Sequence, residues 1–198
     1  MPFLFRLDRE ANITLHFANG RVKCEPHESL TGFYDGQCYR NYTWDDDHGP
    51  PTEENKVAVK AAFEHVYGLI RDEGPFDGVL GFSQGSSCLS GFLIHHETPP
   101  AQEELFKFAI LFSTSGIPEW DTDGKDLGMI RIPTLHVCGE ADKEWVEDSK
   151  AVVGRCENAA ETAELIVHKD GHAVPKDRPT VDAIIRGIKR LVERADVR

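Results

Sequence analysis

The second half of the chain contains four short apolar runs separated by longer stretches with helical periodicity. The runs cover residues 77–82, 107–113, 133–139 and 163–168. Each run ends at small or polar residues, where a strand passes into a loop. Strands that alternate with helices build a parallel sheet with helices on its faces. We therefore expect an α/β fold in which these runs are strands of a mostly parallel sheet.

The stretches that follow these runs predict the flanking helices. A helix over 84–96 follows the first strand, and helices near 143–154 and 178–195 follow the third and fourth. In the last helix, apolar residues recur at helical spacing on one side, which we expect to pack on the sheet. These residues are Val181, Ile184, Ile185, Ile188 and Leu191.

The pattern upstream of the sheet is less regular. Thr52 is placed to cap a long helix that ends near Glu73. The expected buried stripe of this helix consists of Val57, Ala61, Phe63, Val66, Tyr67 and Ile70. Before the helix, residues 13–17 are a strand candidate, and residues 19–51 form an irregular stretch rich in Gly, Asp, Pro and aromatics. A loop of that length in a compact domain usually has a functional role or is partly disordered.

Length and charge restrict the domain count and the partners. A chain of 198 residues fits one domain, so we expect a single domain over residues 1–198. The formal net charge of −12 repels nucleic-acid phosphates and anionic lipid. The longest apolar stretch, residues 108–112, is far shorter than the ~20 residues of a membrane helix. Because the N-terminus also lacks a secretory pattern, we expect a soluble cytoplasmic protein without nucleic-acid or membrane partners.

The cysteines give no sign of a structural bridge or of a metal. There are five, widely spaced and without a C-x-x-C pair, so neither a disulfide framework nor a zinc knuckle is indicated. We expect them to be reduced and mostly buried. His168 and His172 are four residues apart but lie across a strand–loop boundary, so we expect no metal site there. No cofactor is expected.

The sequence Gly-Phe-Ser-Gln-Gly at residues 81–85 is the strongest motif. It is a G-x-S-x-G pattern between a buried strand and a helix, which is the context that a nucleophilic serine requires. The turn is so sharp that neighbouring side chains would collide, so we expect glycine to be needed on both sides. Ser83 is therefore the candidate nucleophile, and the Gln84 N–H is the candidate oxyanion donor.

A serine hydroxyl needs a histidine as base, and that histidine needs an acid to orient it. In an α/β-hydrolase the chain order is serine, acid, histidine. His172 stands in the loop directly after the last expected strand, where this fold places its base. Six other histidines lie in expected strands or helices, where a packed or solvated imidazole is the better interpretation: His16, His65, His95, His96, His136 and His168.

Several carboxylates follow the third expected strand and compete for the role of the acid. They are Glu140, Asp142, Glu144, Glu147 and Asp148. Asp142 is favoured because it lies three residues past Gly139, at the carboxyl end of the strand. The later acids are interpreted as surface charge at the start of a helix.

Together these motifs resemble the small fungal serine hydrolases of the FSH group, a family that includes the thioesterase of lovastatin biosynthesis. The matching residues are 81–85, Ser115-Gly116, 139–142 and 171–175. Asn19-Gly20, residues 32–36 and Tyr39 resemble that family's aromatic substrate-side loop. The resemblance covers nearly the whole chain from about Phe3 onward.

The resemblance implies an α/β-hydrolase with a Ser83–His172–Asp142 triad. It also implies hydrolysis of acyl esters or thioesters in fungal polyketide metabolism. The expected substrate is a small-molecule ester or thioester, or an acyl chain bound to a carrier protein. Two alternatives stay open, a general carboxylesterase and a catalytically weak accessory or binding protein.

The N-terminus departs from the family pattern. Family members begin with a strand that ends in a His-Gly loop, whose N–H is half of the oxyanion hole, followed by a helix. Residues 3–10 resemble the tail of that helix, so we expect an N-terminally shortened fold. The absent strand would lie between 13–17 and 77–82. The strands at 13–17 and 77–82 must then pair in a new arrangement or recruit residues 2–5 as a short strand. Otherwise their backbone N–H and C=O groups stay unpaired, at a free-energy cost of about 1–3 kcal/mol for each buried group.

Overall fold

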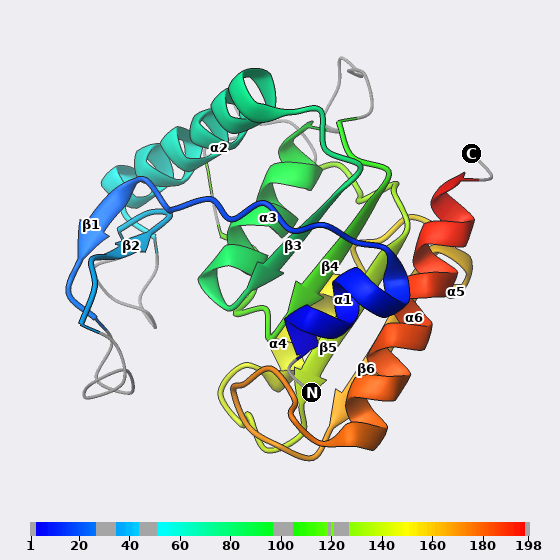
Figure 1. Cartoon of the computed structure of the whole chain (residues 1–198). Coiled ribbons are helices and arrows are strands. Elements are labelled where there is room, and N and C mark those ends of the chain that lie inside the picture. Colours follow the sequence, from blue (N-terminus) through cyan, green and yellow to red (C-terminus); the bar gives the residue numbers. More distant parts are fainter. Residues whose placement is uncertain are drawn as a thin grey trace.

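A parallel sheet organises the computed structural model, which describes residues 3–26, 35–43, 51–96, 105–118, 120 and 127–196 (Figure 1). Within these residues the larger sheet has four strands in the order β3-β4-β5-β6, and neighbouring strands are parallel. They are β3 (Gly78–Phe82), β4 (Phe108–Phe112), β5 (Thr134–Gly139) and β6 (Ala163–His168). The four strands expected from the sequence, and their parallel arrangement, are confirmed.

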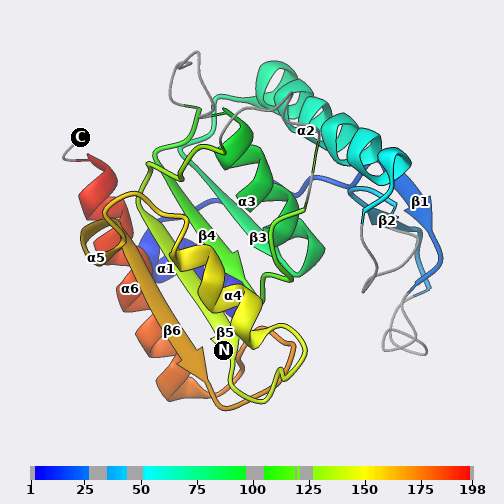
Figure 2. The ribbon, with the colours of Figure 1, turned by 180° about the vertical axis from the view of Figure 1, so that it is seen from behind.

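Helices cover both faces of this sheet. Two lie on the face that Figure 1 presents: α1 (Phe3–Ala11) and α6 (Arg178–Asp196). The opposite face, which Figure 2 presents, carries α3 (Gln84–His96) and α4 (Val146–Val153). The long α2 (Glu53–Glu73) packs against α3, and the short α5 (Ala159–Thr162) precedes β6. No helix among the described residues is long and apolar enough to cross a membrane.

The core consists of two apolar clusters, one on each face of the sheet. Side chains of β4 alternate between them: Ala109 and Leu111 face the α3 side, whereas Phe108, Ile110 and Phe112 face the α6 side. This alternation is the two-residue period of a strand that is covered on both faces. The apolar side chains predicted to face the sheet from α6 are all buried: Val181, Ile184, Ile185, Ile188 and Leu191.

The predicted start of α2 is confirmed, but its predicted buried stripe is partly wrong. Thr52 Oγ1 accepts a hydrogen bond from the Asn55 N–H at 3.2 Å, and Asn55 Oδ1 accepts one from the Thr52 N–H at 2.9 Å. This reciprocal pair is a capping box. Val57 is 67% exposed, while Val59 and Ala62 are buried. Because two residues span 200° of a helix with 3.6 residues per turn, Val57 and Val59 cannot share a face.

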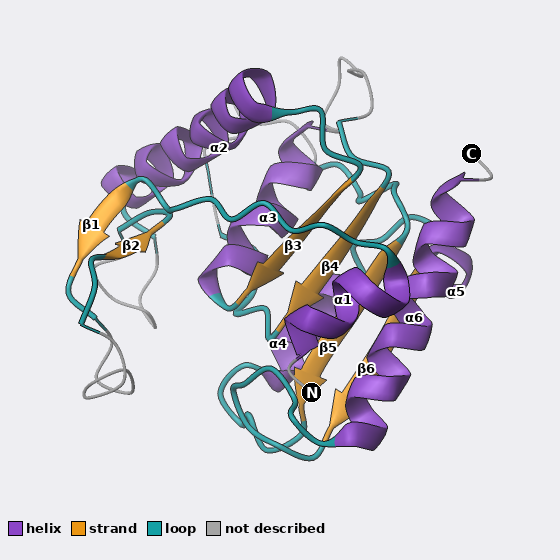
Figure 3. Ribbon diagram, viewed as in Figure 1, coloured by secondary structure: helices purple, strands orange, loops and turns teal. Residues whose placement is uncertain are grey.

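Residues 13–17 were expected to form a strand, and this expectation is wrong. The segment runs as a loop from α1 towards β1 and passes across the sheet instead of alongside β3 (Figure 3). Ile13 and Leu15 pack on the α6-side cluster, whereas Phe17 is 75% exposed. The alternation of apolar and polar residues thus reflects a half-buried segment. A strand also needs a neighbouring ladder, which alternation alone does not report.

The N-terminal residues form helix α1, as the resemblance implied, and therefore do not supply the short strand considered above. Pro2 lies outside the described residues. Within the described part of the chain, β3 is an edge strand, because no other strand pairs with the side opposite β4.

Part of the stretch expected to be irregular is a small antiparallel sheet. β1 (Val22–Cys24) pairs with β2 (Cys38–Arg40) beside the amino end of α2 (Figure 1). The two strands are called the hairpin below. Tyr39, which the family resemblance singled out, belongs to β2, whereas residues 32–34 lie outside the described residues.

Candidate active site

Ser83 lies on the tight turn between β3 and α3. Its φ of 54° is in the left-handed region, which a non-glycine residue rarely adopts. The Ser83 N–H donates a hydrogen bond to the Phe112 carbonyl at 2.9 Å, which ties the turn to the end of β4. The turn therefore holds the Ser83 side chain above the carboxyl end of the sheet.

The two glycines of the motif have different roles. A Cβ on Gly81 would lie 2.7 Å from the Ser86 nitrogen and 2.8 Å from the Gly85 carbonyl carbon, so only glycine fits. A Cβ on Gly85 would meet no atom within 4 Å. The expectation that steric crowding demands glycine is confirmed for Gly81 and wrong for Gly85.

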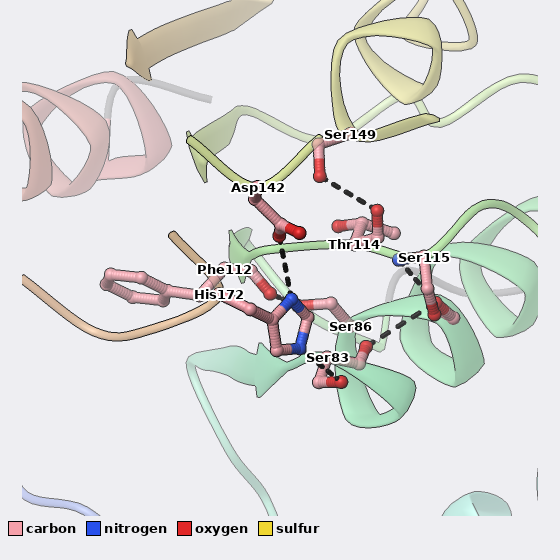
Figure 4. A network of polar contacts seen from close by, with 9 residues as sticks. Ser83, Ser86, Phe112, Thr114, Ser115, Asp142, Ser149 and His172 are labelled. Carbon is pink, nitrogen blue, oxygen red and sulfur yellow. Dashed lines mark hydrogen bonds and ion pairs between the residues drawn. The ribbon is translucent and has the colours of Figure 1, made fainter. Parts of the chain in front are cut away.

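The structure brings Ser83, His172 and Asp142 into one hydrogen-bonded chain (Figure 4). His172 Nε2 lies 2.8 Å from Ser83 Oγ. On the other side of the ring, His172 Nδ1 lies 2.7 Å from Asp142 Oδ2. The Asp142 residue is 6% exposed, whereas the His172 side chain is 34% exposed. One end of the chain is thus shielded from water and the other is open to a ligand.

Two loops meet to place the acid beside the histidine. The Ala141 N–H donates to the Asp170 carbonyl at 3.1 Å, and the Glu140 N–H donates to the His168 carbonyl. A Cβ on Gly139 would lie 2.2 Å from the Asp170 oxygen, so the absence of a side chain allows this approach. The sequence marked Gly139 only as the end of a strand. Its packing role depends on a residue more than thirty positions away in the chain.

The other candidate carboxylates and histidines have different surroundings from Asp142 and His172. Glu140, Glu144 and Glu147 are exposed. His136 is buried in β5 with Nε2 2.9 Å from Thr134 Oγ1, and burial lowers its pKa from 6.5 to about 4. Burial also lowers the pKa of His168. His136 and His168 are thus packed side chains, as the sequence indicated.

Gln84 follows Ser83 directly and is the first residue of α3. Its N–H lies at the N-terminus of α3, where the first N–H groups of a helix have no intrahelical acceptor and the helix dipole is positive. Its side-chain Oε1 accepts from the Asn41 N–H at 2.9 Å, and Nε2 donates to the Tyr42 carbonyl at 3.3 Å. The side-chain contacts, which sequence reasoning missed, attach the residues after β2 to the Ser83 turn.

A group of serines fixes the loop after β4 next to the Ser83 turn. Ser87 Oγ and Ser115 Oγ are 2.9 Å apart, and the Ser115 N–H donates to Ser87 Oγ at 3.0 Å. Ser86 Oγ donates to the Phe112 carbonyl at 2.9 Å (Figure 4). Ser86 and Ser87 are buried, so they hold the loop in place and are closed to a substrate.

A cleft of about 1920 Å³ opens beside Ser83 and His172. It extends from the free edge of β3 to the hairpin, α2 and the segment after α1. Ligand sites typically measure roughly 300–1,000 Å³, so this cleft has room for a large acyl group. Its lining includes aromatic residues of three different segments: Tyr39, Tyr42, Phe76 and Phe82. Among the described residues no group of three or more His, Cys, Asp or Glu is arranged to hold a metal ion.

Comparison with protein-family models identifies the family of the chain. The family model described as serine hydrolase (FSH1) matches residues 4–184. The chain belongs to the FSH1 serine hydrolase family. Ser83, Asp142 and His172 all lie within the matched range. The α/β-hydrolase fold and the hydrolase class expected from the sequence are therefore confirmed at the level of the family.

Curated relatives of the chain share about a third of its residues or slightly less. The hydrolase phiM of Talaromyces stipitatus is 30% identical over 189 residues, which cover 88% of this chain and 73% of that protein. The esterase FPY3 of Fusarium mangiferae is 33% identical over 153 residues, which cover 70% of this chain and 66% of that protein. The chain thus spans about two thirds to three quarters of these relatives.

Solved structures agree on the fold. A carboxylesterase from Mesorhizobium loti superimposes with a TM-score of 0.57 at 18% identity, over 85% of this chain and 71% of that one. A Bacillus cereus carboxylesterase gives a TM-score of 0.56 at 15% identity, over 81% and 72%. This member of the FSH1 family therefore has an α/β-hydrolase fold.

Proposed function

We propose that this protein hydrolyses acyl esters or thioesters with Ser83 as nucleophile, His172 as general base and Asp142 as the orienting acid. The observation that carries the proposal is the continuous contact from Asp142 Oδ2 through the His172 ring to Ser83 Oγ. A serine on a strained turn, a histidine in hydrogen-bond contact with it and a buried acid behind the histidine are the parts that acyl transfer requires.

In the first half-reaction Ser83 Oγ attacks the acyl carbonyl carbon, and its proton passes to His172 Nε2. The Asp142 carboxylate accepts a hydrogen bond from His172 Nδ1–H, which fixes the ring tautomer and stabilises the imidazolium. The Gln84 N–H donates to the developing oxyanion, a type of contact worth roughly 10²–10³ in kcat. His172 then gives its proton to the leaving alcohol or thiol, and the acyl group stays on Ser83.

In the second half-reaction water releases the acyl group. His172 Nε2 takes a proton from the water, whose oxygen attacks the ester carbonyl of acyl-Ser83. Collapse of the tetrahedral intermediate breaks the bond to Ser83 Oγ, which regains its proton from His172. The exposed side of the His172 ring gives water a route to the ester.

For the substrate we favour an acyl ester or thioester of fungal polyketide metabolism, free or bound to a carrier protein. Support comes from the relatives, since one is named an esterase and another a hydrolase, and from a cleft of about 1920 Å³ with aromatic lining. A general carboxylesterase is the alternative, because the carboxylesterases of similar fold use the same architecture.

A fluorophosphonate probe tests the nucleophile. We expect one adduct, on Ser83, located by mass spectrometry of the labelled peptide. It should be absent from Ser83→Ala and present in Ser90→Ala, because the Ser90 hydroxyl donates only within its own helix, to the Ser86 carbonyl at 2.8 Å. An adduct that persists in Ser83→Ala would overturn the assignment.

Turnover then separates the substrate classes. The ratio of kcat/KM for an acyl thioester to that for the matching oxygen ester distinguishes a thioesterase from a general carboxylesterase. Labelling of Ser83 without turnover of either ester would instead support the accessory or binding protein.

A further inference from the structure

Two of the five cysteines lie opposite each other in the hairpin. The register of β1 and β2 places Cys24 directly across from Cys38. Both thiols are free and partly exposed. The remaining three, Cys88, Cys138 and Cys156, are buried. No sequence pattern predicts this pairing, because the two residues are fourteen positions apart and belong to no motif.

The positions of the two cysteines suit a disulfide. Residues opposite each other in an antiparallel pair have Cα atoms about 4.5 or 5.5 Å apart, depending on whether their backbones exchange hydrogen bonds. Both values fall in the range of about 4.4–6.8 Å that disulfides span. Opposite residues also project from the same face of the sheet, with Cβ atoms about 4.5–5.5 Å apart. A shift of about 1 Å therefore brings the Cβ atoms to disulfide distance.

The hairpin is held firmly enough to keep the two residues in register. The Gln37 side-chain amide donates to the Cys38 carbonyl at 2.9 Å and to the Cys24 carbonyl at 3.4 Å. At the other end of the hairpin, a Cβ on Gly20 would lie 2.4 Å from the Arg40 oxygen, so a glycine permits close contact between the two segments. The Gln37 amide thus links the two strands beside the cysteines, and at the other end the two segments lie close together.

The environment separates this pair from the other cysteines. Burial raises the pKa of the Cys88 thiol to about 12, and burial also raises the pKa of Cys138 and Cys156. A buried thiol of that kind is unreactive, because the thiolate is the nucleophile in disulfide exchange. Cys24 and Cys38 instead line the cleft that contains Ser83 and His172, so a small reagent reaches them through the same opening as a substrate.

We propose that Cys24 and Cys38 form a redox-sensitive dithiol that closes to a disulfide across the hairpin. The oxidant is a low-molecular-weight disulfide such as glutathione disulfide. The thiolate of one cysteine attacks a sulfur of that reagent, forming a mixed disulfide and releasing one glutathione thiolate. The second protein thiolate attacks the mixed disulfide, which forms the Cys24–Cys38 bond and releases the second glutathione. The protein dithiol loses two protons and two electrons, and the glutathione disulfide gains them.

The crosslink would act on the wall of the cleft. Because Gln84 binds the residues that follow β2, the hairpin is attached to the Ser83 turn. A disulfide restricts how far the two strands of the hairpin can move apart, so we expect this wall of the cleft to adapt less to a bulky acyl group. We expect KM for a bulky ester to rise several-fold on oxidation, with a smaller change for a short ester. This consequence rests on the proposed function, whereas formation of the disulfide does not.

Mass spectrometry tests the disulfide on the whole native chain. The protein is equilibrated in glutathione buffers of increasing oxidised fraction, its remaining thiols are alkylated, and it is digested without reduction. We expect a crosslinked peptide pair that contains Cys24 and Cys38, while Cys88, Cys138 and Cys156 stay reduced. Cys38→Ser should stop at a mixed disulfide on Cys24, and Cys24→Ser at one on Cys38. Independent alkylation of both thiols in every buffer, or bonds only between chains, would overturn the proposal.

Kinetics test the effect on the cleft. KM and kcat are compared for short-chain and bulky aryl esters, in the reduced and in the crosslinked protein. The control is the oxidant-treated double variant Cys24→Ser/Cys38→Ser, which has neither hairpin thiol and so forms neither the crosslink nor a mixed disulfide in the hairpin. Equal KM values for the bulky ester, with the crosslink shown to be present, would overturn the role of the cleft wall. Absence of turnover in both redox states, with the crosslink formed, would count against the proposed esterase function and leave the dithiol intact.

Discussion

The Asn41 N–H donates a hydrogen bond to Gln84 Oε1 at 2.9 Å, so the residue directly after Ser83 also holds the end of β2. A second bond, from Gln84 Nε2 to the Tyr42 carbonyl at 3.3 Å, completes the attachment. The position of the hairpin, and with it one wall of the cleft, is therefore coupled to the turn that carries the proposed nucleophile.

Replacing Gln84 by alanine should separate its two roles. Gln84→Ala keeps the backbone N–H that we propose as oxyanion donor but loses both bonds to the residues after β2. We expect KM for a bulky ester to rise more than kcat falls, because the loss affects the cleft wall more than the reacting atoms. Steady-state kinetics with short and bulky esters measure this. A fall in kcat at unchanged KM would show that the side chain acts on the chemical step.

The two motif glycines give a matched pair of variants. Gly81→Ala should lower the free energy of unfolding by about 1–3 kcal/mol, because its Cβ would overlap the backbone of α3. Gly85→Ala should leave it unchanged or raise it by up to about 1 kcal/mol, since the position is open and alanine favours a helix. Urea unfolding compares the two variants. Equal losses of unfolding free energy would mean that a side chain is tolerated no better at Gly85 than at Gly81.

The parts of the fold that could be predicted are those where burial shapes the sequence pattern directly. Strands such as β4 are covered on both faces and therefore appear as continuous apolar runs. The strand predicted over residues 13–17 was wrong because a half-buried loop and a half-buried strand produce the same alternation of apolar and polar residues. In α2, the choice of Val57 over Val59 was an error of helical phase, which only the packing partner fixes.

The site could be predicted as far as motifs and chain order reach. Motif and chain order select Ser83, Asp142 and His172, and these three side chains lie in contact, while their catalytic roles remain a proposal. The supporting contacts could not be predicted. Gly139 is needed because of Asp170, and the Gln84 side chain is held by residues more than forty positions earlier. Pairings of this kind depend on the folded chain and leave no local signal.

The acid of the proposed triad can be tested against its neighbour. Asp142→Asn should reduce kcat by up to about 10⁴-fold, because an amide no longer fixes the His172 tautomer. Glu140→Gln serves as the control, because Glu140 is an exposed carboxylate on the same loop. Ester turnover measures both. A comparable loss in Glu140→Gln would move the role of the acid to that residue.

Stability towards acid should depend on His136. Its pKa lies near 4 in the folded protein because the ring is buried, against 6.5 in an unfolded chain. Above about pH 6.5 the ring is neutral in both states, and its full contribution to stability is present. As the pH falls below that value, the unfolded state binds a proton that the folded state does not. The free energy of unfolding should then drop by up to about 1.4 kcal/mol per pH unit, until the folded ring also titrates.

The variant His136→Asn removes this titration and isolates the effect. Its absolute stability will be lower, because the ring fills space in the core and contacts Thr134, so the quantity to compare is the slope of unfolding free energy against pH. Between about pH 7 and pH 5 we expect a shallower slope in the variant than in the parent protein. His168, whose pKa burial also lowers, is unchanged in both proteins and contributes equally. Identical slopes would mean that His136 is protonated in the folded state at its ordinary pKa, which would require the buried ring to gain an acceptor or water.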